Sequence, residues 1–379
     1  MKIKAIYVHL PFCLAKCNYC DFNSYPLPAQ NRRVEDYLAC LAKELELAAG
    51  EVCLDEITTL YLGGGTPTVL TSEQLVSLAK TIYSYLDSTK VIEATIEANP
   101  GTLSIEKLTA LKSAGFNRLS LGIQSLNDAL LKDMGRIHDA KTALSAFNMA
   151  RKVGWGNINV DLIYGLPGQT IDTWLDTLNG VIRLEPEHIA VYGLSLDDLT
   201  PWGSQKLAGS LNLPDESQAL QMYESAKDIL QGQGYIHYEI SNYSLPQRGS
   251  QHNLVYWTNN YYIGIGSGAG SYFSGKRYYN VRGLDNYIFQ LEKGLRPIDE
   301  IIDLTIEDEM AETMFMGLRL MEGVNIAEFH DRFGVSPIKK YAGAMERLAS
   351  YDLLVVEKGN IKLTEKGIPL GNVVFQEFV

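Results

Sequence analysis

The chain is poor in cysteine and has no long hydrophobic run. Five cysteines in 379 residues are too few for a disulfide scaffold and suit the reducing cytosol. No apolar segment approaches the roughly 20 residues that a membrane-spanning helix needs. The first residues, MKIKAIYVHLPFC, hold too short an apolar run for a signal peptide. These absences predict a cytoplasmic protein without an intrinsic membrane segment.

Basic residues are also scarce. The sequence has 33 Lys and Arg against 45 Asp and Glu, which gives a net charge of −12. Proteins that neutralise many phosphates present a basic face, so we expect no nucleic-acid partner. Hydrophobic residues make up 46% of the chain, enough for one large domain and a smaller one.

Three of the five cysteines lie in one short stretch, CLAKCNYC. Cys13, Cys17 and Cys20 have C-x3-C-x2-C spacing, whereas Cys40 and Cys53 are typical small core residues. Four thiolates would close a zinc site or saturate a [4Fe–4S] cluster, and three leave one iron open. The amino and carboxylate groups of S-adenosylmethionine (SAM) fit that vacancy.

Two other interpretations of these cysteines remain at this point. One is a loop with incidental thiols, and the other is a zinc site completed by a distant His or Cys. Aromatic Phe12, Tyr19 and Phe22 surround the triplet and would shield a cluster from water. The spacing and these neighbours favour the cluster.

The first 200 residues alternate short β-branched runs with amphipathic stretches. This alternation predicts successive βα units around a parallel sheet. The expected strands are residues 5–10, 57–64, 91–98, 117–123, 157–165 and 188–196. The expected helices lie near residues 32–49, 72–86, 104–114, 139–153 and 171–183. Six units rather than eight predict an α/β fold with an open or partial (β/α)6 barrel.

The pattern changes after this alternating part. A connecting region contains a helical pattern near 216–232 and an aromatic, glycine-rich segment, 251–273. The chain then returns to helices, which precede two short strands and a final helix. This order predicts a mainly helical, winged-helix-like C-terminal domain, used for packing or oligomerisation because it has no Lys/Arg stripe. The expected divisions are 1–200, 201–300 and 301–379.

A glycine-rich turn follows the second expected strand. In parallel barrels such turns meet at one mouth, where the chemistry gathers. GGGTPT, residues 63–68, would let backbone amides approach a bound amino-acid moiety. By itself a glycine run is only a tight turn.

Polar residues follow the ends of three other expected strands. Buried Glu97 and Asp161 need partners, either groups of SAM or a barrel arginine such as Arg118 or Arg136. Gln124 and Arg136 would contact a ligand or else anchor a loop. Their common placement at one mouth favours a binding site.

HNLVYW, residues 252–257, is the second distinctive motif. An imidazole at His252 beside Tyr256 and Trp257 would suit heme iron and its flat macrocycle. A hydrogen-bonded structural histidine is the alternative. The following GIGSGAGSY, residues 264–272, would complete an adenosyl pocket or form a tight helix entry.

These motifs together resemble the radical-SAM family that contains oxygen-independent coproporphyrinogen III oxidase. The resemblance rests on CLAKCNYC, GGGTPT, EANP, LSLGIQS, VDLIYGLPGQT and HNLVYW in one order. Within that family the chain is most similar to the HemW-type heme chaperones. The resemblance spans essentially the whole chain and implies a radical-SAM barrel with a [4Fe–4S] cluster, SAM and heme.

The resemblance also implies roles for individual residues. It makes Cys13, Cys17 and Cys20 the cluster ligands and His252 the heme ligand. The SAM contacts that it implies are Tyr7, Tyr19, Gly64, Gly65, Thr66, Glu97, Gln124, Arg136, Asp161, Gly193 and Gly270. Gly193 is usually Ala in the oxidase, a departure that still allows a backbone contact.

Two further departures favour a chaperone over the oxidase. The oxidase has a fourth nearby cysteine where this chain has Phe22, and a substantial extension before the position of Tyr7. The resemblance therefore implies transfer of heme to hemoproteins, respiratory ones among them, with enzyme activity left open. The alternatives are the oxidase itself and a heme-dependent radical-SAM methyltransferase. Peripheral membrane contact and a homodimer are compatible with the chaperone.

Overall fold

A twelve-stranded sheet forms the centre of the computed structural model, which describes residues 2–26 and 33–379. Its strand order is β14-β13-β12-β11-β1-β4-β5-β6-β7-β8-β10-β9. Seven consecutive members of this order run parallel, namely β11 (Tyr262–Ile265) and then six strands from the first 200 residues. These six are β1 (Ala5–Leu10), β4 (Thr59–Gly64), β5 (Glu93–Ala98), β6 (Arg118–Gln124), β7 (Ile158–Tyr164) and β8 (His188–Gly193). The predicted six-unit partial barrel is confirmed.

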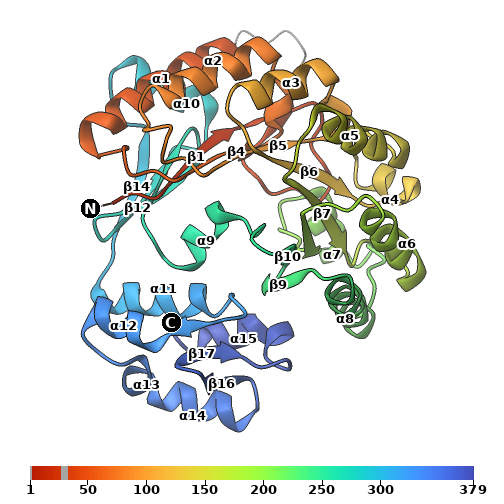
Figure 1. Ribbon diagram of the computed structural model, residues 1–379, viewed down its shortest axis with the longest axis vertical. Coiled ribbons are helices and arrows are strands. Elements are labelled where there is room, and N and C mark those ends of the chain that lie inside the picture. Colours follow the sequence, from red (N-terminus) through yellow and green to blue (C-terminus); the bar gives the residue numbers. More distant parts are fainter. Residues whose placement is uncertain (1, 27–32) are drawn as a thin grey trace.

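Helices cover the outer face of these strands (Figure 1). They are α1 (Arg33–Glu51), α2 (Ser72–Tyr83), α3 (Ile105–Ser113), α5 (Ala140–Val153), α6 (Ile171–Ile182) and α8 (Glu216–Gly232). Capping boxes begin α2 at Thr71 and α6 at Thr170, where each side chain satisfies an orphan backbone donor. The buried side chains of α1 and α2 join one core with the strands. Residue 32, where we expected α1 to begin, lies outside the described residues.

The segment between residues 201 and 300 extends the sheet at both edges. β9 (Ile236–Glu239) and β10 (Asn242–Ser244) follow β8, whereas β11 (Tyr262–Ile265) pairs parallel with β1. Beyond β11 come β12 (Gly270–Phe273), β13 (Lys276–Asn280) and β14 (Ile298–Asp303). The same segment contains α7 (Pro201–Leu207), α9 (Gln251–Trp257) and α10 (Leu284–Glu292). Sequence periodicity missed β10 to β14, because each has only three to six residues.

The C-terminal residues form a helical module with its own core. Its helices are α11 (Ile306–Gly317), α12 (Ile326–Phe333), α13 (Pro337–Lys340), α14 (Ala342–Ser350) and α15 (Gly371–Gln376). A small sheet of β15 (Val324–Asn325), β16 (Leu354–Glu357) and β17 (Asn360–Leu363) accompanies them, with β16 and β17 as an antiparallel hairpin. The expected helices and wing-like hairpin are therefore present.

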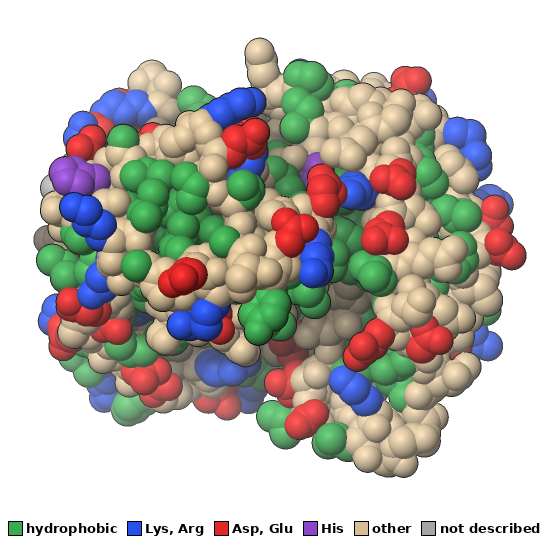
Figure 2. All heavy atoms as spheres, turned by 90° about the horizontal axis from the view of Figure 1, so that it is seen from below, with side chains coloured by type: hydrophobic (Ala, Val, Ile, Leu, Met, Phe, Trp, Pro, Cys, Tyr) green, Lys and Arg blue, Asp and Glu red, His purple; other side chains and the backbone are tan. Residues whose placement is uncertain are grey.

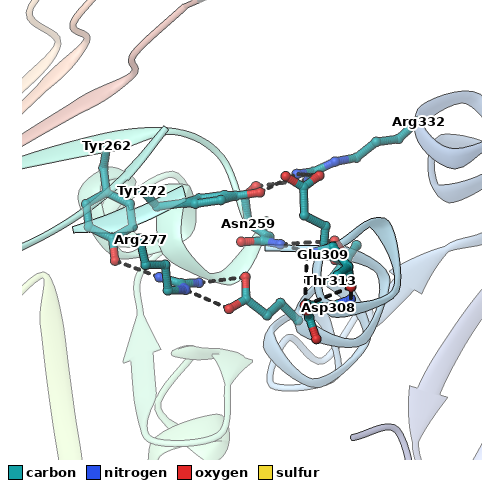
Figure 3. A network of polar contacts seen from close by, with 10 residues as sticks. Asn259, Tyr262, Tyr272, Arg277, Asp308, Glu309, Thr313 and Arg332 are labelled. Atoms are coloured by element: carbon teal, nitrogen blue, oxygen red, sulfur yellow. Dashed lines mark hydrogen bonds and ion pairs between the residues drawn. The ribbon is translucent and has the colours of Figure 1, made fainter. Parts of the chain in front are cut away.

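Polar contacts attach this module to the edge of the large sheet (Figure 3). Arg277 of β13 donates from Nε and Nη2 to the carboxylate of Glu312 in α11, at 2.6 and 2.8 Å. Arg332 of α12 donates from Nη2 to the hydroxyl of Tyr272 in β12, at 3.1 Å. These contacts place α11 close to α9 and to the sheet.

The described residues on the face of the molecule seen in Figure 2 form no basic stripe. On the face seen in Figure 2, Lys and Arg side chains are interspersed with Asp and Glu, and hydrophobic side chains gather in one area. Over the described parts of the chain, no helix is both long and apolar enough to cross a membrane.

Candidate cofactor site at the barrel mouth

The turns that follow the parallel strands surround one cavity of about 470 Å³. Parallel strands place these turns at one mouth, as the sequence predicts. Twelve of the expected site residues line the cavity: Cys13, Cys17, Cys20, Tyr19, Gly64, Gly65, Thr66, Glu97, Gln124, Arg136, Asp161 and Gly193. Tyr7, His252 and Gly270 do not line it.

The cysteine loop follows β1 and is held over the cavity by its neighbours. The backbone N–H of Asn18 donates to the carbonyl of Met134 at 3.0 Å, which ties the loop to the turn before Arg136. Thr66 Oγ1 donates to Cys13 Sγ at 3.7 Å, and Arg136 Nη1 donates to Cys17 Sγ at 3.6 Å. Donors at the sulfurs stabilise the thiolate form that an iron ligand requires.

The spacing of the three thiols bears on which metal centre they suit. Within the two described stretches, no group of three His, Cys, Asp or Glu side chains is arranged to hold a single metal ion. A cubane cluster binds each thiolate through a different iron, so its ligands stand further apart than those of a mononuclear zinc. The three thiols face one cavity and lack a fourth cysteine beside them, which fits a [4Fe–4S] cluster with an open iron.

Gly64 and Gly65 allow the β4 turn to approach the cysteine loop closely. Gly64 has φ +111°, and a Cβ there would lie 2.4 Å from the ring of His9. A Cβ on Gly65 would lie 2.6 Å from the carbonyl oxygen of Phe12. A side chain at Gly64 would therefore displace His9 of β1, and one at Gly65 would displace the backbone just before Cys13, so both glycines are required for the shape of the site.

Two carboxylates face the cavity from β5 and β7. Glu97 accepts from the hydroxyl of Tyr61 at 2.7 Å and from the backbone N–H of Gly64 at 3.1 Å. Asp161 accepts from Asn159 Nδ2 at 2.7 Å and from Ser120 Oγ at 3.2 Å. Burial raises the pKa of Glu97 to about 7 and also raises the pKa of Asp161.

The arginine ion pairs that were one alternative for these carboxylates are not formed among the described residues. Arg136 Nη2 instead donates to the carbonyl of Gly122 at 2.6 Å. Arg118 lowers the pKa of both carboxylates, but no ion pair within 4.0 Å joins it to either. Glu97 and Asp161 therefore keep oxygens available for a cationic or hydroxyl-bearing ligand.

Gln124 reaches the cavity through an irregularity of β6. The register between β6 and β7 shifts between Gly122 and Gln124, and Gln124 has φ +68°. A left-handed conformation is costly for a residue with a side chain and often marks a functional position. The irregularity turns the carboxamide of Gln124 toward the cavity.

The HNLVYW motif forms the short helix α9, whose N-terminus is capped by Glu93. The Glu93 carboxylate accepts from the backbone N–H groups of Gln251 and His252, both at 3.0 Å. The His252 side chain is 1% exposed, and its Nδ1 shares a hydrogen bond with Thr59 Oγ1 at 2.9 Å. Its Nε2 shares another with the Tyr256 hydroxyl at 2.8 Å.

The environment of His252 keeps its imidazole neutral. Burial lowers the pKa of His252 to about 3, and the positive charge of Arg118 contributes. The ring lies 5.0 Å from that of Tyr61, which in turn donates to Glu97. Tyr61 therefore lies between His252, the candidate heme ligand, and the cavity carboxylate of Glu97.

Tyr7 and Gly270 do not line the cavity. The Tyr7 hydroxyl shares a hydrogen bond with His9 Nδ1 at 2.9 Å, and His9 Nε2 shares one with the carbonyl of Asn23 at 2.8 Å. Tyr7 therefore supports His9, which lies next to Gly64 at the cavity wall. Gly270 begins β12 beside Tyr279.

Sequence reasoning missed several cavity residues. They are Tyr61, Ser120, Asn159, Tyr192, Asn242 and Asn253. The period-two alternation of strands was an available signal for Ser120 and Asn159, because Ser120 lies two residues after Arg118 and Asn159 lies two before Asp161. No local pattern identifies Asn242 or Asn253, which reach the cavity from β10 and α9.

Comparison with known families agrees with this geometry. The Radical SAM superfamily profile matches residues 7–180, and the profile of the HemN C-terminal domain matches residues 304–370. Coproporphyrinogen III oxidase (HemN) from Escherichia coli has the same fold, with TM-score 0.85 and 24% identity, covering 100% of this chain and 90% of that one. The barrel and the cysteine loop thus define a radical SAM protein.

The curated relatives are more specific. Heme chaperone HemW of Bacillus subtilis (strain 168) is 38% identical over 100% of this chain and 99% of its own length. Heme chaperone HemW of Lactococcus lactis subsp. lactis (strain IL1403) is 38% identical over 100% of this chain and 98% of its own. The chain belongs to the HemW family.

Proposed function

We propose that this protein is a heme chaperone, which binds heme and passes it to hemoproteins. The proposal is supported by the full-length similarity to proteins named heme chaperones. The observation that carries it is the placement of His252, a neutral imidazole on α9 between the barrel and the C-terminal module (Figure 1). A neutral imidazole is the form that coordinates iron.

The cavity residues would hold a [4Fe–4S] cluster and SAM. Cys13, Cys17 and Cys20 would ligate three irons, and a cluster with an open iron supplies reductive cleavage of SAM when both are bound. Gly64 and Gly65 would give the methionine moiety room, while Glu97 and Asp161 would accept from its ammonium and from ribose hydroxyls. Tyr19 would close one side, since its ring packs 6.0 Å from that of Trp202.

Heme ligation by His252 requires a local rearrangement. Its Nε2 is bonded to Tyr256 and its side chain is buried, so the phenol must move before iron can approach. A change in the χ1 rotamer of Tyr256 would move its hydroxyl away from Nε2 without breaking the Thr59 contact on Nδ1. The remaining hydrogen bond would orient the ring, as such bonds do for metal-bound histidines.

The partners and location follow from the chaperone proposal. Hemoproteins, respiratory ones among them, would receive the heme in the cytoplasm or at the membrane surface. Peripheral membrane contact and a homodimer remain compatible with this role. The division into a barrel of residues 1–200, a heme-motif region of 201–300 and a helical domain of 301–379 is part of the same proposal.

Anaerobic transfer of heme to a recipient tests the function directly. Protein with a reconstituted cluster is loaded with hemin and mixed with apomyoglobin, and the Soret band reports transfer. A chaperone gives saturable loading near one heme per chain and complete transfer. No specific hemin binding, with porphyrin formed from coproporphyrinogen III instead, would replace the proposal by the oxidase. Loss of heme with a SAM-dependent linear tetrapyrrole would favour the methyltransferase.

A further inference from the structure

The floor of the cavity contains a cation that the proposed cofactor contacts leave unused. Arg118 begins β6 and lines the cavity, yet it is only 2% exposed. Across residues 2–26 and 33–379, its guanidinium makes no hydrogen bond and no ion pair within 4.0 Å, and its buried Nε has no partner. Five donors on one buried group are therefore unsatisfied by the protein.

Such a guanidinium is costly to bury. An arginine cannot lose its proton at any ordinary pH, so it cannot escape the penalty by becoming neutral. Buried charges in proteins are paired, hydrogen-bonded or ligand-bound. Glu97 and Asp161 reduce the penalty from a distance, but neither carboxylate forms an ion pair with Arg118 within 4.0 Å.

Two neutral donors line the same cavity and are also unpartnered. The Tyr192 hydroxyl, on β8, makes no hydrogen bond to any described residue. The carboxamide of Asn253, on α9, likewise makes none. A protonated phenol and an amide N–H complement an anion without adding charge.

We propose that Arg118, with Tyr192 and Asn253, anchors a carboxylate of a second ligand that enters the cavity together with SAM. A planar, singly charged carboxylate matches the guanidinium fork. A doubly charged phosphate would be repelled more strongly by Glu97 and Asp161. The groups that bind SAM in the proposed function are not used by this anchor.

Two kinds of ligand could bring a carboxylate to Arg118. One is a tetrapyrrole with a propionate arm, and this choice rests on the proposed function. The other is a small free carboxylic acid. A cavity of about 470 Å³ is in the lower half of the range of about 300–1,000 Å³ for small-molecule pockets, so beside SAM it admits an arm but not a whole macrocycle.

Iron-free porphyrins separate this anchor from ligation by His252. Protein with a reconstituted cluster and saturating SAM is dialysed anaerobically against protoporphyrin IX or its dimethyl ester. We expect the acid to bind at least about 10-fold more tightly than the ester, because charge-assisted hydrogen bonds are lost in the ester. In Arg118→Gln this ratio falls below about 3-fold, while Arg118→Lys keeps part of it. Arg183→Gln, at an exposed position, is the control for general electrostatic attraction.

Sodium propionate alone tests the second kind of ligand. A rise in thermal midpoint with propionate that Arg118→Gln abolishes, without discrimination between the porphyrins, assigns the anchor to a small acid. Equal binding of acid and ester together with no propionate effect overturns the proposal, as does discrimination that persists in Arg118→Gln. SAM binding by each variant verifies that its barrel is intact. Hemin titration of the same samples reports the proposed function separately, since it measures iron ligation.

Discussion

At the residue scale, Glu97 combines burial with available oxygens, and this predicts a pH-dependent affinity for SAM. Its pKa of about 7 means that the carboxyl is largely protonated at pH 6 and largely ionised at pH 8. Only the carboxylate attracts the positive charges of SAM, so affinity rises between these pH values and levels off above them. Equilibrium dialysis of cluster-loaded protein should show about a 10-fold rise.

Glu97→Gln provides the matched control for this profile. The carboxamide keeps the shape and still accepts from Tyr61, but it cannot ionise. We expect Glu97→Gln to bind SAM more weakly. Its affinity should keep only the pH dependence that comes from titration of the amino group of SAM. A wild-type slope that survives unchanged in Glu97→Gln would assign the titration to another group.

The same scale shows how far sequence reasoning reaches into the site. Cysteine spacing and strand-end polarity predicted residues that line one cavity, because the ends of parallel strands meet at one edge. The contact of His252 with Tyr256 follows from their spacing of four residues on one helix. The contact of His252 with Thr59 was not predictable, since that contact depends on how α9 packs against β4. The lack of partners at Arg118 is likewise a tertiary property.

At the element scale, Glu44 attaches α1 to the turn between β11 and β12. This buried carboxylate accepts from the Gly266 N–H at 2.8 Å, from Asn280 Nδ2 at 2.6 Å and from the hydroxyl of Tyr287 at 2.5 Å. In Glu44→Gln one carboxylate oxygen becomes an NH2 group, which would face a hydrogen-bond donor. The Asn280 carboxamide cannot flip to present its oxygen instead, because its Nδ2 also donates to the Gly266 carbonyl. We expect unfolding in urea to show a loss of about 1–3 kcal/mol.

The control for this substitution lies on the same helix. Glu46 is exposed, so Glu46→Gln should change stability by less than about 0.5 kcal/mol. Burial also raises the pKa of Glu44 to about 7, so the folded state binds its proton more tightly than the unfolded state. This tighter proton binding stabilises the folded state at low pH, and the stabilisation declines as pH rises from about 4.5 to 7. Glu44→Gln lacks this pH dependence, because its side chain cannot ionise. Equal losses in the two variants would refute a specific role for Glu44.

At the scale of the whole molecule, a buried ion pair attaches the C-terminal module to the sheet. The Arg277 and Glu312 side chains are 11% and 13% exposed (Figure 3). Removing one partner leaves the other charge buried, so Arg277→Gln should lower the free energy of unfolding by about 3 kcal/mol. The adjacent pair of Lys276 and Asp303 is 41% and 77% exposed, so Lys276→Gln should destabilise the protein far less than Arg277→Gln. Similar losses in the free energy of unfolding in urea for Arg277→Gln and Lys276→Gln would contradict this account of the attachment.

The architecture at this scale was predictable in part. The alternation of β-branched runs with amphipathic stretches over residues 5–196 predicted the parallel strands, because parallel neighbours need a helical crossover between them. The extension of the sheet by β10 to β14 was not, since strands this short carry little periodic signal. Their placement depends on pairing with β8 and β1, which are distant in sequence.

Release of His252 from Tyr256 is the most direct test of heme binding at α9. The measurement is an anaerobic hemin titration, followed at the Soret band, of wild-type protein, Tyr256→Phe and His252→Gln. Because the phenol occupies Nε2, Tyr256→Phe should bind hemin about 3- to 10-fold more tightly, as loss of one hydrogen bond frees the ligand. His252→Gln should shift the Soret band and weaken binding. Hemin binding and spectra that are identical in all three proteins would contradict ligation by His252 and place the heme elsewhere.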